Sequence, residues 1–472
     1  MTTPLPPDET SRNARQRRRL VIAGARGALG RALIQRLNPD FDIIALSRRP
    51  DETLPGATTT RQVDLFSRKE TFEGLRDTEL AVYAVHQSRF RARLTQARLD
   101  DLDVLCADNF GRAAAHHGLS HIVYPGCDTP PNAAHDLGRT REIADALGAH
   151  GVPVITLRLP IILDPQSALT RQALALASRN HPRLQPYYHA ETAPIAIGDV
   201  IDACAAILAN PDAFAGTYGL HGPETLSFKA LVEALATRQR HTPEWREPGL
   251  LASLTPSSSP VGEEWLDILQ ELLETPTRHP RTFPFEDSCH RALTPLDDAL
   301  DACLSPDEDA GELAEVAASP APLPSLVRSV QRLPLPAGRD ARWTAHEYVR
   351  WLPTALRFLI RATHTHDESG GSVARFFIGP IPWPILELTL APQVSTPDRQ
   401  LFWITGGMLA RRSQKGRLEF RQIAHTDRVI VAIHDFEPRL PWVLYRFTQA
   451  LFHLWVVERF KRHLARLSER AA

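Results

Sequence analysis

Short apolar runs alternate with amphipathic stretches along the first third of the chain. Leu29, Leu33 and Leu37 follow the first run at helical spacing, and a second stretch with helical spacing covers 99–119. The runs that predict strands lie at 20–23, 42–49, 80–86, 121–126 and 152–160, and a further strand ends at 62–65. Strands and helices that alternate at this length predict an α/β fold with a Rossmann-type, doubly wound parallel sheet.

A glycine-rich turn joins the first predicted strand to the first predicted helix. Gly24, Gly27 and Gly30 stand where a phosphate-binding turn needs a tight bend, close approach of a diphosphate, and close packing of helix on strand. The N–H groups at the start of the helix would face the phosphates. The alternative is a Gly-rich turn in an unrelated α/β unit. The residues predicted to form this part of a dinucleotide site are Gly24, Arg26, Gly27, Ala28, Leu29 and Gly30.

The end of the second predicted strand indicates which dinucleotide is bound. NAD enzymes usually carry a carboxylate there, which accepts a hydrogen bond from the ribose 2′-hydroxyl. This chain has Ser47, Arg48 and Arg49 instead, and a guanidinium group suits a 2′-phosphate. Arg26 would add a second positive group. The alternative is a solvated basic turn before Pro50, but the pattern favours NADP(H) over NAD(H).

Several segments extend this pattern into a family resemblance. The glycine spacing, Tyr83-Ala-Val-His-Gln-Ser, His121-Ile-Val-Tyr-Pro-Gly and the segment 192–200 resemble the NmrA-like atypical short-chain dehydrogenases/reductases. The chain is most similar to a long bacterial form of that family with a C-terminal domain of unknown function. The resemblance covers about 19–240, with weaker similarity to about 304. It implies a substrate cleft beside Asp199 and further cofactor contacts at Asp64, Leu65, Val85, Arg139 and Pro160.

The chain departs from the typical short-chain reductases at the catalytic positions. Their proton donor is a Tyr whose pKa is lowered by a Lys four residues later, and no Tyr-x-x-x-Lys follows the fifth predicted strand. His135 and Arg139 have the same separation and would form a substituted acid and ribose clamp; the alternative is a capped helix start with solvated arginines. Tyr124 is a second candidate acid, although its strand position is also typical of a core or cleft-wall residue. Cys127-Asp128 occupies the catalytic Ser position.

Length and composition predict two domains in a reducing compartment. A chain of 472 residues exceeds what one hydrophobic core serves. Five scattered cysteines without CxxC spacing, and an N-terminal segment without an apolar run, predict a cytoplasmic protein. The net charge of -1 does not indicate a nucleic-acid partner, and the short Arg-rich run at 15–19 has no interleaved aromatic residues.

Pro-rich and charged segments mark the expected boundaries. We expect a disordered tail at 1–18 and an NAD(P)-binding Rossmann domain at 19–304, whose residues from about 242 form a small substrate-side subdomain. An acidic Pro/Ala linker is expected at 305–325. The remaining residues, 326–472, form the second expected domain.

The C-terminal part has a different pattern. Strand-like runs at 374–378, 400–405, 416–423 and 428–434 precede one expected long helix at 441–467, which indicates an α+β helix-grip layout. The segments 418–421 and 434–447 resemble the C-terminal domain of the long NmrA-like form, which is similar to START-like (polyketide cyclase-type) ligand-binding folds. That resemblance implies an apolar cavity with Trp442, Tyr445, Phe452, Trp455 and Phe460 in its wall.

Two other kinds of site receive less support. Arg446, Gln449 and His453 interrupt the apolar part of the last helix, so a membrane span is rejected. Arg459, Lys461 and Arg462 beside aromatic residues would suit a surface-lying membrane anchor, but a core-packing helix is favoured. His364 with His366, and Cys289 with His290, lack a third ligand, so no metal site is expected.

The function predicted from these patterns is an NADPH-dependent oxidoreductase that acts on an apolar small molecule, such as a quinone or a lipid-like carbonyl. Hydride would come from the nicotinamide, and the proton from His135, Tyr124 or water. The alternative is a non-catalytic NADP(H) sensor or scaffold, which the missing Tyr-x-x-x-Lys favours. A third class is a peripheral-membrane assembly factor.

Overall fold

The computed structural model divides the chain into two compact units. The first unit comprises Met1–His86 and Asn109–Gly311, and the second comprises Gln87–Asp108 and Glu312–Ala472. The expected contiguous domains therefore need one correction, because 87–108 belongs to the second unit. The expected linker and nearly all of the expected tail lie outside the described residues. The structure describes 17–49, 53–85, 94–96, 99–127, 139–164, 182–238, 245, 269–270, 273–274, 281–303, 327–356, 360–366, 372–410, 416–423 and 426–471.

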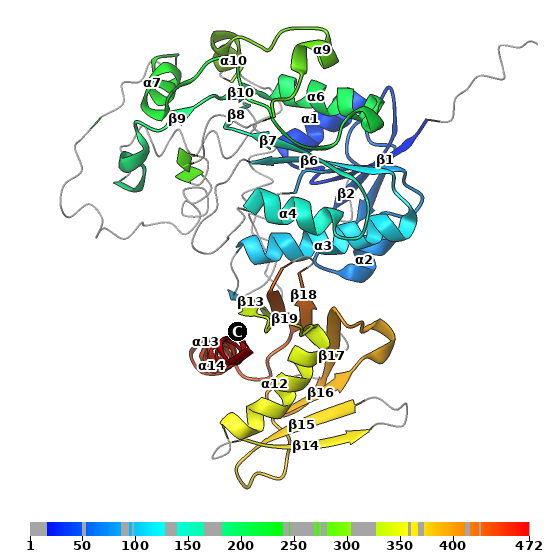
Figure 1. Ribbon diagram of the computed structural model, residues 1–472, viewed down its shortest axis with the longest axis vertical. Coiled ribbons are helices and arrows are strands. Elements are labelled where there is room, and N and C mark those ends of the chain that lie inside the picture. The colour runs from blue at the N-terminus through cyan, green and yellow to red at the C-terminus, as the bar shows by residue number, and fades with distance from the viewer. Residues whose placement is uncertain are drawn as a thin grey trace, which may run out of the picture. The chain divides into compact units, whose positions relative to one another are not determined.

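The first unit is built on a seven-stranded sheet in the order β11-β7-β6-β4-β1-β2-β3 (Figure 1). Its strands are β1 (Arg19–Ala23), β2 (Asp42–Ser47), β3 (Thr59–Gln62), β4 (Leu80–Tyr83), β6 (His121–Cys127), β7 (Val154–Leu159) and β11 (Gly216–Gly219). All neighbouring strands are parallel. The order reverses between β1 and β4, the point at which doubly wound sheets bind ligands. The predicted Rossmann-type sheet is confirmed.

Helices cover both faces of this sheet and bury both sides of its central strands β1, β2 and β4. The covering helices are α1 (Ala28–Leu37), α2 (Arg68–Gly74), α3 (Leu99–His117), α4 (Arg139–Gly148) and α6 (Ile197–Ala209). Figure 1 shows α1 and α6 on one face and α3 and α4 on the other. Leu33 and Leu37 of α1 are buried in the same core as Leu20 of β1, as their spacing predicts.

The first unit also has a smaller core formed by later segments. Leu231 and Leu235 of α7 (Phe228–Arg238) pack with Leu300 of α10 (Leu296–Ala302). Ser227 caps α7, as its Oγ accepts a hydrogen bond from Ala230 N at 3.1 Å. The other short elements here are β8 (Ile162–Leu163), η2 (Pro182–Tyr187), β9 (Glu191–Thr192), β10 (Ile195–Ala196), η3 (Pro211–Ala213), β12 (Leu226–Ser227) and α9 (Phe285–Cys289). An amphipathic helix that the sequence pattern predicts at 264–273 lies mostly outside the described residues.

The second unit has an eight-stranded sheet in the order β14-β15-β16-β17-β18-β19-β13-β5. Its strands are β5 (Leu94–Gln96), β13 (Val327–Pro334), β14 (Ile360–His366), β15 (Ser372–Ile378), β16 (Leu386–Leu390), β17 (Arg399–Gly406), β18 (Arg417–Gln422) and β19 (Arg428–Phe436). All pairings are antiparallel except that of β5 with β13. The four predicted strands are confirmed as β15, β17, β18 and β19, while β5, β13, β14 and β16 were not predicted. The second unit is thus α+β, and its assignment as START-like stays a prediction.

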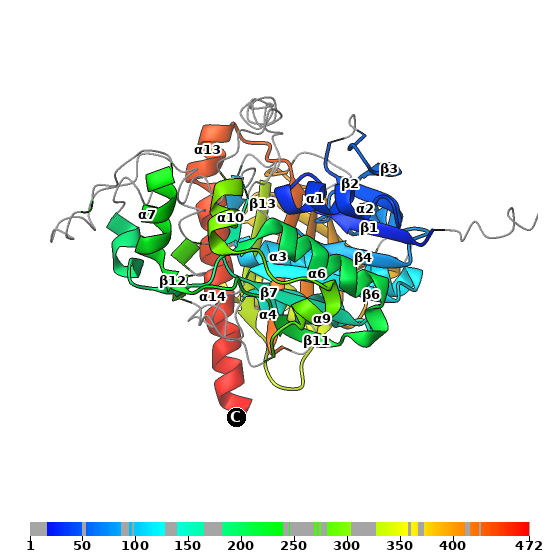
Figure 2. The same ribbon diagram turned by 90° about the horizontal axis from the view of Figure 1, so that it is seen from above.

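Among the described residues, the helices that accompany this sheet are α12 (Ala341–Ala355), α13 (Trp442–Phe447) and α14 (Gln449–Ala471), with a short η5 (Pro392–Val394). Tyr348 of α12 packs against Phe460 of α14, with ring centroids 5.1 Å apart, and against Phe420 of β18 at 5.5 Å. The prediction of a single long helix at 441–467 is wrong. Thr448 has backbone angles of φ -125° and ψ -77°, outside the helical region, so the segment forms two helices in succession (Figure 2).

Charged side chains are buried on the face of the second sheet opposite to Phe420. Glu419 is 1% exposed, and its Oε1 accepts hydrogen bonds at 2.7 Å from both Arg399 Nε and Arg421 Nε. Arg421 Nη1 also donates to Asp108 Oδ2 at 2.7 Å, and His434 Nε2 lies 3.1 Å from Glu419 Oε2. Burying any one of these charged groups without an oppositely charged partner would cost free energy of folding. The stability of the folded state therefore requires that they be buried together. We call Asp108, Arg399, Glu419, Arg421 and His434 the buried ion cluster.

The buried ion cluster should make the stability of the second unit depend on pH. Burial and the nearby Arg417 lower the pKa of His434 to about 4, against the opposing influence of Glu419. Between pH 6.5 and about 4, the unfolded chain therefore binds a proton that the folded chain does not, and stability falls as pH falls. The expected loss is about 3 kcal/mol. Denaturant unfolding of the second unit across this pH range measures it.

Replacing His434 by glutamine should flatten this pH dependence. The matched control is His346→Gln, because His346 is exposed on α12 and lies outside the buried ion cluster. A wild-type stability that stays constant from pH 6.5 to pH 4 would contradict the prediction.

Candidate functional site

The β1–α1 turn lies against the end of β4. Gly24 has a φ of +83°, and a Cβ on it would come within 2.0 Å of the carbonyl oxygen of Ala84. A Cβ on Gly30 would meet the carbonyl oxygen of Gly24 at 2.2 Å. Only glycine fits at either position, so the turn and the helix approach the sheet as closely as backbone allows. This is the geometry in which a diphosphate can reach main-chain N–H groups.

The start of α1 supplies those N–H groups. Helix α1 follows Gly27, and the amide of Arg31 donates to the carbonyl oxygen of Gly27 at 2.9 Å. The first N–H groups of a helix have no intrahelical acceptor, which here applies to Ala28, Leu29 and Gly30. The first turn of α1 carries no acidic residue that would repel a phosphate.

Basic groups gather at the end of β2, next to this turn. Ser47 is 4% exposed, and its Oγ accepts hydrogen bonds from Arg26 Nε at 2.7 Å and from Arg49 N at 3.1 Å. The hydrogen bond between Arg26 and Ser47 brings the guanidinium of the glycine turn to the strand end that carries Arg48 and Arg49. Four of the predicted residues are thus brought together by the structure.

The residues expected near the adenine and nicotinamide have local structural roles. Asp64 Oδ1 accepts from Phe66 N at 3.1 Å in the turn after β3, and the carbonyl oxygen of Leu65 accepts from Asn109 Nδ2 at 2.8 Å. Val85 is buried just after β4. Their contacts with a cofactor stay predictions.

The expected catalytic segment is only partly described. Arg139 is the first residue of α4 and is buried, and Pro160 follows β7 and is half-buried. Cys127 ends β6, and its carbonyl oxygen accepts a hydrogen bond from Thr140 Oγ1. His135 and Asp128 lie outside the described residues. The pairing of His135 with Arg139 therefore stays a prediction.

Tyr124, the other candidate acid, lies in the core of the first unit. Its side chain is 2% exposed, and its ring centroid is 6.0 Å from that of Tyr83. A Cβ on Gly126 would approach the Tyr124 ring to within 2.7 Å, so the ring is closely enclosed. This position corresponds to the core alternative, and a role in proton donation stays a prediction.

The side chain of Asp199 is buried and hydrogen-bonded within the first unit. It is fully buried and accepts hydrogen bonds from Arg291 Nη2 at 2.7 Å, from Thr294 N at 3.0 Å and from Thr294 Oγ1 at 2.8 Å. These bonds attach the 291–294 segment to α6. A role of Asp199 beside a substrate cleft stays a prediction.

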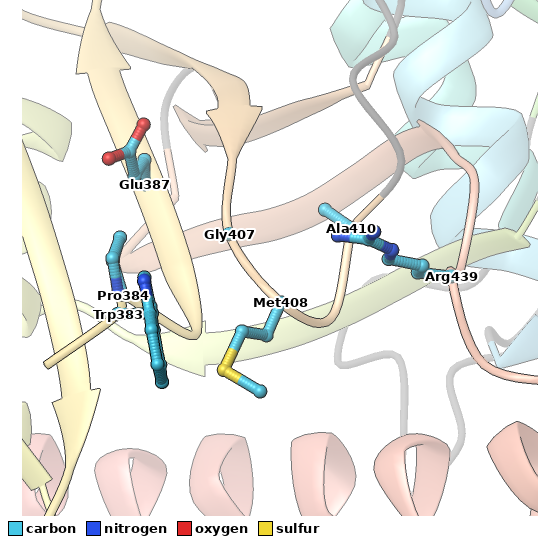
Figure 3. Close-up of a pocket in the computed structure, with 7 residues that line it drawn as sticks. All are labelled: Trp383, Pro384, Glu387, Gly407, Met408, Ala410 and Arg439. Atoms are coloured by element: carbon cyan, nitrogen blue, oxygen red, sulfur yellow. The ribbon is translucent and has the colours of Figure 1, made fainter. Parts of the chain in front are cut away.

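The second unit contains a cavity of about 730 Å³, and none of the residues that line it was predicted from the sequence. It is lined by Trp383, Pro384, Glu387, Gly407, Met408, Ala410 and Arg439. Figure 3 shows Trp383 and Met408 next to each other, with Arg439 on the opposite side. Trp383 is 66% exposed, although tryptophan is usually well buried. A signal was available in Pro380-Ile-Pro-Trp-Pro384, a loop sequence that places a tryptophan between prolines.

The predicted cavity wall on the last helix needs correction. Tyr445 and Phe460 are buried in the core, while Phe452 and Trp455 are exposed, the latter to 41%. The two halves of the expected aromatic wall thus lie on different faces of the helix. The side chain of Trp442 lies outside the described residues.

The described residues contain neither a metal-binding cluster nor a membrane-spanning helix. No group of three or more His, Cys, Asp or Glu in that part of the chain could hold a metal ion. No helix among the described residues is both long and apolar enough to cross a membrane.

Comparisons with known proteins give one relative in sequence. No family model matches the chain. The auxiliary protein GraX of Staphylococcus aureus is 30% identical over 143 residues, which are 30% of this chain and 44% of that protein. The chain thus spans less than half the length of this curated relative.

Solved structures show only a general likeness. A nucleoside-diphosphate-sugar epimerase from Staphylococcus aureus is 19% identical, with a TM-score of 0.45 over 60% of this chain and 99% of that one. The Citrobacter sp. triphenylmethane reductase complexed with NADP(H) is 18% identical, with a TM-score of 0.44 over 61% and 100%. An NADPH-dependent quinone oxidoreductase from Escherichia coli is 17% identical, with a TM-score of 0.44 over 60% and 98%.

Proposed function

We propose that the first unit binds NADP(H) and that the chain is an atypical oxidoreductase acting on an apolar small molecule, such as a quinone or a lipid-like carbonyl. The observation that carries the proposal is the hydrogen bond of Arg26 Nε to Ser47 Oγ, at the strand end occupied by Arg48 and Arg49. An enzyme specific for NAD needs a carboxylate at this position to hold the ribose hydroxyls. Three guanidinium groups suit a ribose 2′-phosphate instead.

The rest of the site fits the same cofactor. Gly24 and Gly30 let the turn pack against β4 and the helix pack against the turn, where a Cβ would not fit. The first N–H groups of α1 would hold the diphosphate. Bound NADPH would supply hydride from its nicotinamide ring. In this proposal Arg26, Arg48 and Arg49 select the phosphorylated cofactor, and the glycine turn orients it.

The cavity of the second unit supports the substrate class. Trp383 and Met408 give it an exposed apolar wall, and Glu387 and Arg439 supply polar groups that would orient a ligand. By this proposal the second unit is a START-like ligand-binding domain. The scattered spacing of the five cysteines supports a cytoplasmic location.

A non-catalytic NADP(H) sensor is the second candidate function. It is favoured by the burial of Tyr124, since a tyrosine that is 2% exposed and packed against Tyr83 is poorly placed to donate a proton to a substrate. In this alternative the nucleotide site is retained, and its occupancy is the signal.

Cofactor selection is the first prediction to test. Replacing both Arg48 and Arg49 by alanine should weaken NADPH binding about 10- to 100-fold, because charge-assisted hydrogen bonds contribute about 1.5–3 kcal/mol. NADH affinity should stay within about threefold, because NADH has no 2′-phosphate. Isothermal titration calorimetry of both nucleotides on wild type and variant measures this.

The control variant is Arg36→Ala with Arg76→Ala, which removes two exposed arginines elsewhere in the first unit. This control variant should keep the preference of the wild type for NADPH over NADH. Equal affinity of the wild type for NADPH and NADH, or binding of neither, would overturn the proposed cofactor. If NADPH binds, its oxidation by quinones and aldehydes decides between reductase and sensor.

A further inference from the structure

The end of the second unit presents a concentrated apolar surface. Among the described residues nine large apolar side chains are exposed, and five of them lie on α13 and α14: Leu444, Phe447, Leu451, Phe452 and Trp455. Phe447 is 65% exposed and Leu451 is 55% exposed. We call these five residues the apolar patch. Single exposed apolar residues are ordinary, but a contiguous group marks an interaction surface.

The apolar patch follows from the way in which α14 packs. Val457, Phe460 and Leu464 are buried in the core, so one face of the helix is already occupied. Leu451 and Trp455 stand four residues apart on the opposite face. The ring centroids of Phe452 and Trp455 lie 5.6 Å apart, so these two side chains of the apolar patch are in contact. A helix that needed only core packing would carry polar residues at these positions.

The outward face of α14 becomes basic beyond the apolar patch. In the second half of the helix, the described exposed charges are four cations against two carboxylates: Arg459, Lys461, Arg462 and Arg466 against Glu458 and Glu469. The guanidinium of Arg459 lies 4.9 Å from the ring centroid of Trp455, at the junction of the two halves. Figure 2 shows α13 at the start of α14 and the C-terminus at its far end. One helix face therefore carries aromatic groups first and cationic groups next.

We propose that this face binds the surface of an anionic lipid bilayer. Tryptophan and phenylalanine side chains favour the boundary between headgroups and acyl chains, and arginine and lysine are attracted to anionic headgroups. A bilayer surface complements both halves of the helix face at once. A second copy of this chain does not, because a two-fold interface pairs a surface with itself and leaves the cationic half without an anionic partner.

Sedimentation with lipid vesicles tests the proposal on the full chain. Vesicles of phosphatidylcholine containing one-third phosphatidylglycerol should bind the protein at low salt at least about tenfold more tightly than pure phosphatidylcholine, and high salt should weaken the binding. Replacing Arg459, Arg462 and Arg466 together by glutamine should reduce the binding about 100-fold. Replacing Leu451 and Trp455 by glutamine should reduce it about tenfold or more.

Matched controls separate the site from bulk charge and exposure. Arg76→Gln with Arg141→Gln and Arg350→Gln removes three exposed arginines elsewhere, and Trp403→Gln removes an exposed tryptophan outside the patch. Both should bind vesicles like the wild type.

Two results would overturn the proposal: no binding to anionic vesicles, or equal loss of binding in the controls. In the first case, self-association in light scattering that Trp455→Gln abolishes would identify a second copy of the chain as the occupant. Circular dichroism of each variant checks folding. NADPH binding is measured separately, so failure here leaves the proposed function intact.

Discussion

Replacing Glu419 by glutamine should lower the free energy of unfolding of the second unit by about 3–5 kcal/mol. The carboxylate of Glu419 is the acceptor that Arg399 and Arg421 share, and both guanidinium groups are buried with it. Glutamine has a similar volume but no charge, so the variant would leave a buried excess of positive charge. Urea unfolding followed by tryptophan fluorescence measures the loss, because six of the eight tryptophans lie in the second unit.

The matched control is Glu458→Gln, which removes an exposed carboxylate paired with Arg462 on α14. We expect it to cost less than about 0.5 kcal/mol, since exposed ion pairs one helical turn apart contribute little. The neighbouring Arg421 and Arg399 hold the pKa of Glu419 well below its usual range in spite of burial. The stabilisation is therefore present above about pH 4.5 and is lost in stronger acid. Equal effects of the two variants would contradict the buried ion cluster as a stabilising element.

Replacing Gly24 by alanine should both destabilise the first unit and abolish measurable NADPH binding. The added Cβ would lie 2.0 Å from the carbonyl oxygen of Ala84, on a residue whose φ is +83°. The backbone strain and the overlap together should cost about 2–5 kcal/mol. Because relief of the overlap must move the turn away from β4, the N–H groups that we propose to bind the diphosphate move as well. Thermal unfolding and calorimetric titration with NADPH, below the unfolding temperature of the variant, measure both effects.

Gly118→Ala separates the two causes. Gly118 also has a positive φ, +70°, but an added Cβ would meet nothing within 4 Å. It should cost only the backbone strain, about 1–2 kcal/mol, and leave NADPH binding unchanged. If Gly24→Ala is no more harmful than Gly118→Ala, the turn does not approach the sheet as closely as the structure indicates.

The sequence by itself determined the Rossmann-type half of the fold. The glycine turn, the strand before it and the helix after it are adjacent in the chain, and each follows from local apolar spacing and from where glycine is required. Arg48 and Arg49 at the end of β2 belong to the same local pattern, so the expectation of NADP(H) needs no coordinates and stays a prediction. The contact between Arg26 and Ser47 needed the structure, although both residues had been predicted.

In the second unit, the local sequence pattern does not predict which charged side chains are buried or which segments belong to the domain. Arg417, Glu419 and Arg421 alternate with Leu418 and Phe420, which is typical of a strand with one solvated face. Yet Glu419 and Arg421 are buried. The burial of Arg421 depends on its pairing with Asp108, a residue 313 positions away in the chain. The sequence likewise assigned 87–108 to the first domain, because nothing in that segment shows that β5 pairs with β13.

The orientation of the last helix was decided in the same way. Its aromatic residues are numerous enough for either a cavity wall or an outward face, and composition does not distinguish the two. Only the packing of Phe460 against Tyr348 turns Leu451 and Trp455 away from the core. Tertiary structure decided these features because the environment of a side chain depends on the surface packed against it. For β18 and α14, that surface is contributed by residues distant in the chain.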